Sequence, residues 1–255
     1  MDTTLEGKVA LVTGGSRNVG RETALALGKM GADVVVTYVH NQSGAMETVQ
    51  KLTAQGVRAE ALQINLTGTS EIDVFVSNFK GVLSKWGRSN FDILVNNAGI
   101  IKLGTFDKVT EEDLDALYQT NYKSVFFLTQ KLVGSIADDG RIVNIGSGTA
   151  GIAFAPLVGY GPLKAAIQSL TLYLASFLGE RRITVNAVAP GGLDDDFNSG
   201  LFKQMPKAKD FISSSTALGR MGKPNDIGSV IAFLCTESAS FINGAIIPID
   251  GGFHL

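Results

Sequence analysis

The sequence is poor in the side chains that build metal sites and disulfides. Its 255 residues include one cysteine, Cys235, and two histidines, His40 and His254. A single cysteine excludes an intramolecular disulfide, and so few thiol and imidazole groups disfavour a zinc site. We therefore expect no bound metal, and a cofactor held mostly by backbone amides and hydroxyl groups.

Excess charge and long apolar runs are also absent from the sequence. The formal net charge is -2, and no cluster of lysine and arginine resembles a patch that binds nucleic acid. No apolar run approaches the roughly 18 residues needed to cross a bilayer, and residues 1–8 lack the pattern of a signal peptide. These absences predict a soluble, cytoplasmic protein without nucleic-acid or membrane partners.

Short β-branched runs alternate along the chain with longer stretches of helical period. Strands are predicted at residues 9–13, 33–38, 58–64, 93–95, 141–145, 183–188 and 245–249. Helices are predicted at residues 19–30, 43–55, 70–86, 111–136, 160–179 and 225–235. This alternation predicts an α/β fold of the doubly wound Rossmann type, with a seven-stranded, mostly parallel sheet and helices on both faces. The length fits a single domain over residues 1–255.

One segment inside that domain has no clear period. Residues 192–215 carry three consecutive aspartates, 194–196, and three consecutive serines, 213–215. Long irregular segments inside compact domains are often functional. We interpret this one as a substrate-loop insertion that acts as a lid, with a plain surface loop as the alternative.

The first predicted strand leads through a glycine-rich turn directly into a helix. Glycines at 14, 15 and 20 would let the backbone approach a pyrophosphate, whose charge is met by free amides and the helix dipole. The interval from Gly15 to Gly20 also resembles a P-loop, but Arg21 and Glu22 replace its Lys and Ser/Thr. The turn therefore favours a dinucleotide and disfavours a nucleotide triphosphatase.

The end of the second predicted strand indicates which dinucleotide binds. An acidic residue there would bond the ribose of NAD and repel a 2′-phosphate, but Tyr38 occupies the place and His40 and Asn41 follow. Arg17 in the glycine turn could give a 2′-phosphate a charge-assisted hydrogen bond. The sequence thus predicts NADP(H) over NAD(H). Arg17 as a solvated loop cation and His40 as a surface residue remain the alternatives.

A tyrosine and a lysine in the second half of the chain are four residues apart. On a helix Tyr160 and Lys164 would share one face, and the ammonium group would lower the pKa of the phenol from about 10, so that it could donate a proton. Pro162 lies between them, which places the start of the helix near residues 158–161. Ser147 follows a predicted strand, but no histidine motif accompanies it, so a serine hydrolase is disfavoured.

Together these motifs resemble those of the short-chain dehydrogenase/reductase family. Thr13, Gly14 and Gly20 match its Thr-Gly-x-x-x-Gly-x-Gly turn, with Asn18 in place of the middle glycine, and asparagine tolerates positive φ. Further matches are Asn-Asn-Ala-Gly at 96–99, Pro-Gly at 190–191 and Asp-Gly-Gly at 250–252. Residues 219–224 bring the resemblance nearest to the 3-oxoacyl-[acyl-carrier-protein] reductase-like branch.

The resemblance implies an NADP(H)-dependent oxidoreductase that interconverts a carbonyl and an alcohol by hydride transfer, with a 3-oxoacyl substrate among the candidates. It implies that Ser147 bonds the substrate oxygen, Tyr160 transfers the proton and Lys164 holds the nicotinamide ribose. Asn121 would order a water leading to Lys164. Asn65 and Leu66 resemble the family's adenine contact, with Asn in place of Asp. The predicted cofactor-binding residues are Gly14, Ser16, Arg17, Asn18, Val19, Gly20, Tyr38, His40, Asn41, Asn65, Leu66, Asn97, Ala98, Gly99, Tyr160, Lys164, Pro190 and Gly191.

A catalytically weak NADP(H)-binding regulator on the same fold is the alternative function. Asn18 keeps it open, as does Asp195, which stands where many relatives have a threonine that contacts the nicotinamide carboxamide. The complete set of four catalytic residue types favours the enzyme.

The substrate pocket is expected to be built by residues 148–159 and 192–215. Their apolar side chains predict an apolar small-molecule substrate, although they could equally be loop anchors or oligomer contacts: Ile152, Phe154, Phe197, Leu201 and Phe202. The resemblance also implies a homotetramer, assembled through the helix that bears Tyr160 and through the C-terminal region.

Overall fold

The computed structural model describes residues 4–253 and 255, so residues 1–3 and His254 lie outside it. Seven strands form one sheet in the order β3-β2-β1-β4-β5-β6-β7, and every neighbouring pair is parallel. The doubly wound fold is therefore confirmed. The strands are β1 (Val9–Val12), β2 (Asp33–Tyr38), β3 (Ala59–Gln63), β4 (Phe91–Asn96), β5 (Ile136–Ile145), β6 (Thr184–Pro190) and β7 (Ile246–Ile249).

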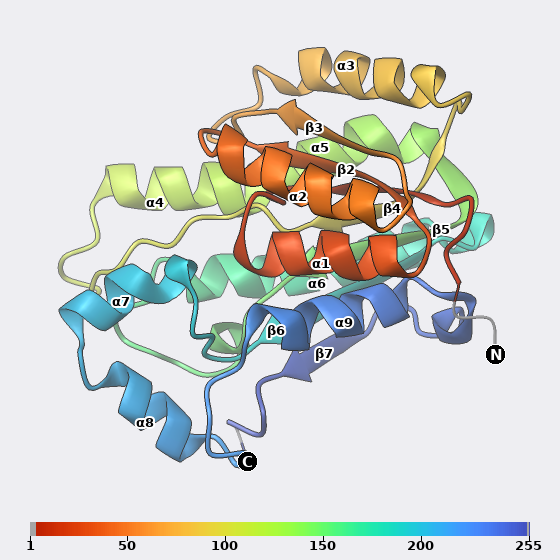
Figure 1. Cartoon of the computed structure of the whole chain (residues 1–255). Coiled ribbons are helices and arrows are strands. Elements are labelled where there is room, and N and C mark those ends of the chain that lie inside the picture. Colours follow the sequence, from red (N-terminus) through yellow and green to blue (C-terminus); the bar gives the residue numbers. More distant parts are fainter. Residues whose placement is uncertain (1–3, 254) are drawn as a thin grey trace.

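Helices cover both faces of the sheet (Figure 1). In β1, Ala10 and Val12 face one core while Val9 and Leu11 face the other, because successive side chains of a strand point to opposite sides. The helices α1 (Asn18–Lys29), α2 (Gln42–Ala54) and α9 (Pro224–Leu234) pack on the first face. The helices α3 (Ile72–Lys85), α5 (Ser124–Leu132) and α6 (Gly161–Phe177) pack on the second. In the part of the chain that the structure describes, no helix combines the length and apolar character that a bilayer crossing requires.

The single helix predicted over residues 111–136 is wrong. The structure has α4 (Glu111–Tyr118), then a π-helical turn at Gln119–Lys123, then α5, and β5 already begins at Ile136. A π-helical turn shifts the helical phase by about one residue without interrupting the apolar pattern, so the sequence period does not reveal it.

The segment 192–215 contains more regular structure than its sequence indicates. A 3-10 turn at Asp196–Asn198 leads into α7 (Ser199–Gln204), and α8 (Ala208–Ser215) follows. In Figure 1 these two short helices stand apart from the helices that cover the sheet. Their buried residues are few, Leu201 in α7 and Ala208 and Ile212 in α8, which explains why no strong helical period appears.

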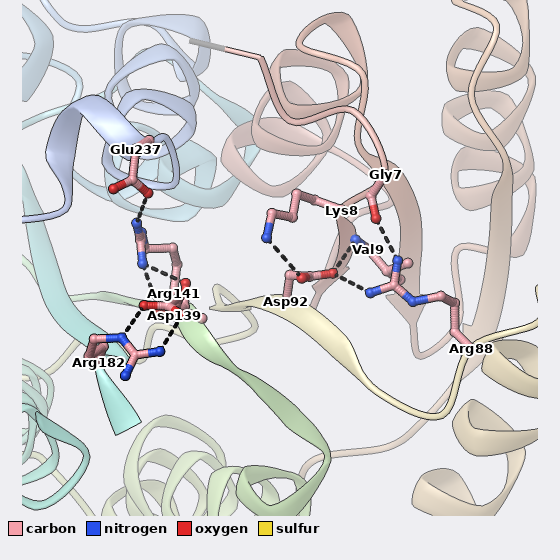
Figure 2. A network of polar contacts seen from close by, with 10 residues as sticks. Gly7, Lys8, Val9, Arg88, Asp92, Asp139, Arg141, Arg182 and Glu237 are labelled. Carbon is pink, nitrogen blue, oxygen red and sulfur yellow. Dashed lines mark hydrogen bonds and ion pairs between the residues drawn. The ribbon is translucent and has the colours of Figure 1, made fainter. Parts of the chain in front are cut away.

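A network of ion pairs stabilises the edge of the sheet where the strands begin (Figure 2). The Asp92 carboxylate, nearly buried, accepts hydrogen bonds from Lys8 Nζ at 3.2 Å, the Val9 amide at 2.9 Å and Arg88 Nη2 at 3.0 Å. Nearby, Arg141 Nη2 pairs with Glu237 at 3.3 Å. These charges thus stabilise the amino-terminal ends of β1 and β4 and the middle of β5, away from the carboxyl ends of the strands.

Candidate active site

A large cavity lies at the carboxyl ends of the strands, beside the β1–β4 pair where the strand order reverses. In a doubly wound sheet this switch point is the usual ligand crevice. The cavity has a volume of about 810 Å³. All eighteen residues predicted to bind cofactor line it, and so does Ser147, whereas Asn121 does not.

The glycine turn between β1 and α1 is held in a tightly packed form. A side chain at position 20 would collide with the carbonyl oxygen of Gly14, so this position requires glycine. Asn18 takes a φ of 50°, the left-handed conformation that its place in the turn demands. Asn97 Nδ2 braces the turn by donating to the carbonyls of Thr13 at 2.8 Å and Gly14 at 3.1 Å. The geometry that a pyrophosphate would need therefore survives the exchange of glycine for Asn18.

The amino terminus of α1 has the donors that an anionic diphosphate requires. No side chain caps the first turn, and no acidic residue lies in it. The first amides of a helix lack intrahelical acceptors and carry the positive end of the dipole. The described residues at this end of the cavity therefore fit the pyrophosphate of a dinucleotide.

Residues at and after the end of β2 line the part of the cavity that contains the glycine turn. Arg17 is exposed, and its guanidinium has no ion pair with any described residue. Asn41 accepts a hydrogen bond from the Gly44 amide at 3.1 Å and thereby caps α2. Asn65 Oδ1 similarly accepts from the Thr67 amide at 3.0 Å, which leaves its NH₂ group to reach a ligand. Among the described residues, Arg17 is thus a cation without an ion pair that lines the same cavity as Tyr38. Asn41 and Asn65 each use their side-chain oxygen to accept a backbone hydrogen bond.

Three of the four predicted catalytic residues meet at the other end of the cavity. Tyr160 is the N-cap residue of α6, and Pro162 lies in the first turn of that helix, as predicted. Lys164 Nζ donates a hydrogen bond to the Ile145 carbonyl at 2.8 Å and lies 5.6 Å from the centre of the Tyr160 ring. The Ser147 hydroxyl, just after β5, lies 2.8 Å from Thr149 Oγ1. The ends of β5 and α6 thus bring a serine, a phenol and an amine together.

The expectation that Lys164 lowers the pKa of Tyr160 is wrong. Burial raises the pKa of the phenol above its ordinary value, the hydrogen bond with Ser147 opposes this rise, and the negative charge of Asp195 adds to it. Burial also lowers the pKa of Lys164 to about 8. The amine sits in the same desolvated pocket and donates its hydrogen bond to the Ile145 carbonyl, and it is not among the causes that shift the pKa of the phenol.

Asn121 makes side-chain contacts that the sequence did not predict, and its role in ordering a water stays a prediction. Its side chain is buried in the π-helical turn between α4 and α5. Its Oδ1 accepts a hydrogen bond from the Ile100 amide at 3.0 Å, and its Nδ2 donates to the Ile100 carbonyl at 3.0 Å. The amide group therefore holds the chain after β4, next to Gly99, which itself lines the cavity.

Two residues that support Ser147 were missed in the sequence. Thr149 contacts the Ser147 hydroxyl, and Gln168 Nε2 donates to the Ser147 carbonyl at 3.1 Å. Gln168 follows Lys164 by four residues and Tyr160 by eight, so helical spacing places all three on one face of α6. That spacing is the signal by which Gln168 could have been found. Thr149 has no comparable signal, because its contact depends on a 3-10 turn at Gly148–Ala150.

Comparison with known proteins identifies the family to which this chain belongs. A family model described as Enoyl-(Acyl carrier protein) reductase matches residues 14–254. Together with the relatives that follow, this match shows that the chain belongs to the short-chain dehydrogenase/reductase family.

The relatives are similar over nearly their whole length. The short chain dehydrogenase mdpC of Emericella nidulans is 36% identical, with 97% of this chain and 96% of that protein covered. The trihydroxynaphthalene reductase PfmaI of Pestalotiopsis fici is 33% identical, with 97% of this chain and 89% of that protein covered. A crystal structure of the angucycline C-6 ketoreductase LanV with bound NADP has a TM-score of 0.93 and 38% identity, with 98% of this chain and 96% of LanV covered.

Proposed function

We propose that this protein is an NADP(H)-dependent ketoreductase that reduces a carbonyl group of an apolar, ring-containing substrate to an alcohol, or catalyses the reverse oxidation. The observation that carries the proposal is a single cavity with the glycine turn at one end and Ser147, Tyr160 and Lys164 at the other. A dinucleotide that spans it would bring its reactive ring to these three side chains.

The residues at the chemical end have separate tasks in the reduction. When bound, the dinucleotide supplies a hydride to the carbonyl carbon. Ser147 donates a hydrogen bond to the carbonyl oxygen, and Tyr160 donates the proton as negative charge develops there. The raised pKa of Tyr160 supports this task, because the phenol then carries its proton at neutral pH. Lys164 holds the ribose, and Asn121 keeps residues 99–100 in place beside it.

The preference for NADP(H) rests on charge at the outer end of the cavity. Among the described residues, Arg17 has no ion-pair partner, and no acidic side chain lines the cavity near Tyr38 and His40. A 2′-phosphate would gain a charge-assisted hydrogen bond from Arg17 and meet no repulsion. LanV, which was crystallised with NADP, supports the same preference.

The walls of the chemical end favour a flat, apolar substrate. Phe154, Phe197 and Phe202 line them, together with aliphatic residues of the segment 192–215. Similarity to a trihydroxynaphthalene reductase and an angucycline ketoreductase supports a fused-ring aromatic ketone. A 3-oxoacyl thioester is the second candidate, favoured by residues 219–224.

The segment 192–215 acts as a lid in this proposal. Phe202 of α7 and Phe211 of α8 line the cavity, so the segment covers the place where substrate would enter. Substrate and cofactor should protect it from protease, since closure orders a segment with few buried contacts. If protease cleaved the segment equally fast with and without substrate and cofactor, the segment would be a plain surface loop and not a lid.

A homotetramer and a cytoplasmic location complete the proposal. Large apolar side chains stand exposed on α6, with Tyr173 at 74% and Phe177 at 76%, and Phe241 is exposed near β7. Exposed patches of this kind mark association surfaces. Light scattering should report about four times the chain mass of 26.9 kDa.

The test of the function is NADPH consumption with two sets of substrates. Fused-ring aromatic ketones should be reduced faster than 3-oxoacyl thioesters, and Tyr160→Phe should abolish most of the turnover. Tight NADPH binding without turnover on any carbonyl would instead favour the non-catalytic regulator. Asn18 no longer supports that alternative, because its φ of 50° suits the turn.

A further inference from the structure

One carboxylate lines the cavity, and the proposed chemistry does not use it. Asp195 is the single acidic residue among the described residues that line this space. The other ionisable residues there divide between the two ends: Arg17, Tyr38 and His40 lie near the glycine turn, and Tyr160 and Lys164 lie at the chemical end.

The chain fixes Asp195 in place without neutralising it. Its Oδ1 accepts hydrogen bonds from the Asn198 amide at 3.1 Å and from Asn198 Nδ2 at 2.8 Å, so the carboxylate caps the 3-10 turn Asp196–Asn198. The nearby Lys209 pairs with Asp194 instead, at 2.5 Å. Among the described residues no cation lies within ion-pair distance of Asp195. Both of these hydrogen bonds reach Oδ1, and the backbone amide of Phe197 also stabilises the carboxylate. Among the described residues, Oδ2 has no side-chain donor.

The position of Asp195 brings its charge close to the reacting group. Phe197, in the turn that Asp195 caps, has its ring centre 6.5 Å from that of Tyr160. The charge of Asp195 contributes to the raised pKa of Tyr160, and burial raises the pKa of Asp195 itself. Asp195 is therefore a partly desolvated carboxylate beside the proton donor.

A purely apolar ligand in this cavity would remove water from the Asp195 carboxylate and offer it no hydrogen bond in return. Sealing the cavity removes water from Asp195, and a buried charge without a partner is costly. A ligand that brings its own hydrogen-bond donor avoids that cost. A neutral hydroxyl group suits the apolar walls better than an ammonium group, whose own desolvation would oppose binding.

We propose that Asp195 is a specificity-determining residue that accepts a hydrogen bond from a hydroxyl group of the substrate, so that the enzyme selects hydroxylated aromatic ketones over the same ketones without the hydroxyl. This inference rests on the proposed ketoreductase function. It adds the requirement that a hydroxyl group lie on the same side of the ring system as the carbonyl that Tyr160 protonates.

The test compares 1-tetralone with its four derivatives that carry one hydroxyl group on the aromatic ring. The hydroxyl preference is the ratio of kcat/KM for the best hydroxylated isomer to kcat/KM for 1-tetralone, measured with NADPH. Wild type should show a preference of about 10- to 100-fold, the value of one charge-assisted hydrogen bond. Asp195→Ala should reduce it to about 3-fold or less. Asp196→Asn is the matched control, since that neighbour is exposed and does not line the cavity, and it should keep the preference.

Binding measurements separate failure of this inference from failure of the proposed function. Calorimetry with the enzyme–NADP⁺ complex gives the same ratio as dissociation constants, without turnover. If no ketone is reduced but the binding ratio depends on Asp195, the ketoreductase function fails and the inference stands. If ketones are reduced and Asp195→Ala keeps the wild-type preference, the inference is overturned. It is also overturned if Asp195→Ala weakens NADPH binding about tenfold and leaves the hydroxyl preference intact, because the carboxylate would then serve the cofactor.

Discussion

Gln168 Nε2 donates a hydrogen bond to the carbonyl oxygen of Ser147 across 3.1 Å. Gln168 lies on the same face of α6 as Tyr160 and Lys164, and Lys164 makes the equivalent bond to the Ile145 carbonyl at 2.8 Å. One helix therefore carries the phenol and also fixes the end of β5, from which Ser147 projects. The spacing between the serine and tyrosine hydroxyls depends on these two bonds.

Gln168→Met should lower kcat while NADPH affinity stays within about twofold. The substitution keeps the length of the side chain and removes the donor, at a cost of about 0.5–1.5 kcal/mol, or roughly 2- to 10-fold in rate. Steady-state kinetics and a cofactor titration measure the two effects. Gln130→Met, at an exposed helical glutamine, is the control and should change neither. An unchanged kcat would show that Gln168 does not position Ser147.

Tyr160→Phe should lower turnover by roughly two to four decades, the usual contribution of a positioned acid or base. The ring remains, so its packing against Phe197 and the dissociation constant for NADPH should change little. Single-turnover kinetics with the best ketone give the rate, and fluorescence titration gives the affinity. Turnover close to wild type would refute Tyr160 as the proton donor.

Arg17→Ala should weaken NADPH binding about 10- to 100-fold and leave NADH binding nearly unchanged. The change removes one charge-assisted hydrogen bond to the 2′-phosphate, worth on the order of 1.5–3 kcal/mol. Tyr38→Asp should shift the preference toward NADH, because a carboxylate bonds the ribose hydroxyls and repels the phosphate. Titration of both cofactors against wild type and the two variants measures these effects. Equal wild-type affinity for NADH and NADPH at moderate salt would contradict this assignment.

The stability of the protein without cofactor should respond to pH through Lys164. Its pKa is about 8 in the folded protein against an ordinary value of 10.5. Between these values the unfolded chain holds a proton that the folded chain has released, so the free energy of unfolding rises with pH. Below pH 8 both states hold the proton and the burial penalty is present in full. The slope approaches about 1.4 kcal/mol per pH unit at most.

Lys164→Met supplies the comparison for that pH effect. The difference in unfolding free energy, wild type minus variant, should rise between pH 7 and about pH 9.5. Taking the difference removes the contribution of Cys235, whose pKa burial raises and whose effect has the opposite sign. Urea unfolding at several pH values provides the data. A flat difference would mean that Lys164 keeps an ordinary pKa.

Asp92→Ala should lower the free energy of unfolding by about 2–3 kcal/mol and leave kcat near wild type. The change strands the Val9 amide and two cations at the start of the sheet, while the site lies at the opposite edge. Asp73→Ala, which removes an exposed pair with Lys131, should cost no more than about 0.5 kcal/mol. Denaturant midpoints measure both variants. Similar losses of unfolding free energy for the two variants would show that the Asp92 network contributes no more to stability than an exposed ion pair.

The sequence by itself determined the sheet, the glycine turn and the Tyr160–Lys164 pair. These features follow from local rules: apolar runs for strands buried on both faces, glycine where backbones touch, and a spacing of four along one helix face. The requirement for positive φ at Asn18 could also be read locally, and the structure agrees at 50°. Every predicted cofactor-binding residue lines one cavity, because parallel strands end at the same edge.

Only the tertiary structure decided what depends on contacts between distant residues. The π-helical turn places Asn121 against Ile100, and the folded pocket raises the pKa of Tyr160 in spite of Lys164. The short helices α7 and α8 form with few buried residues of their own, and the turn before them brings Asp195 to Tyr160. Desolvation and through-space charge depend on which surfaces meet, and a pattern of neighbours along the chain does not contain that information.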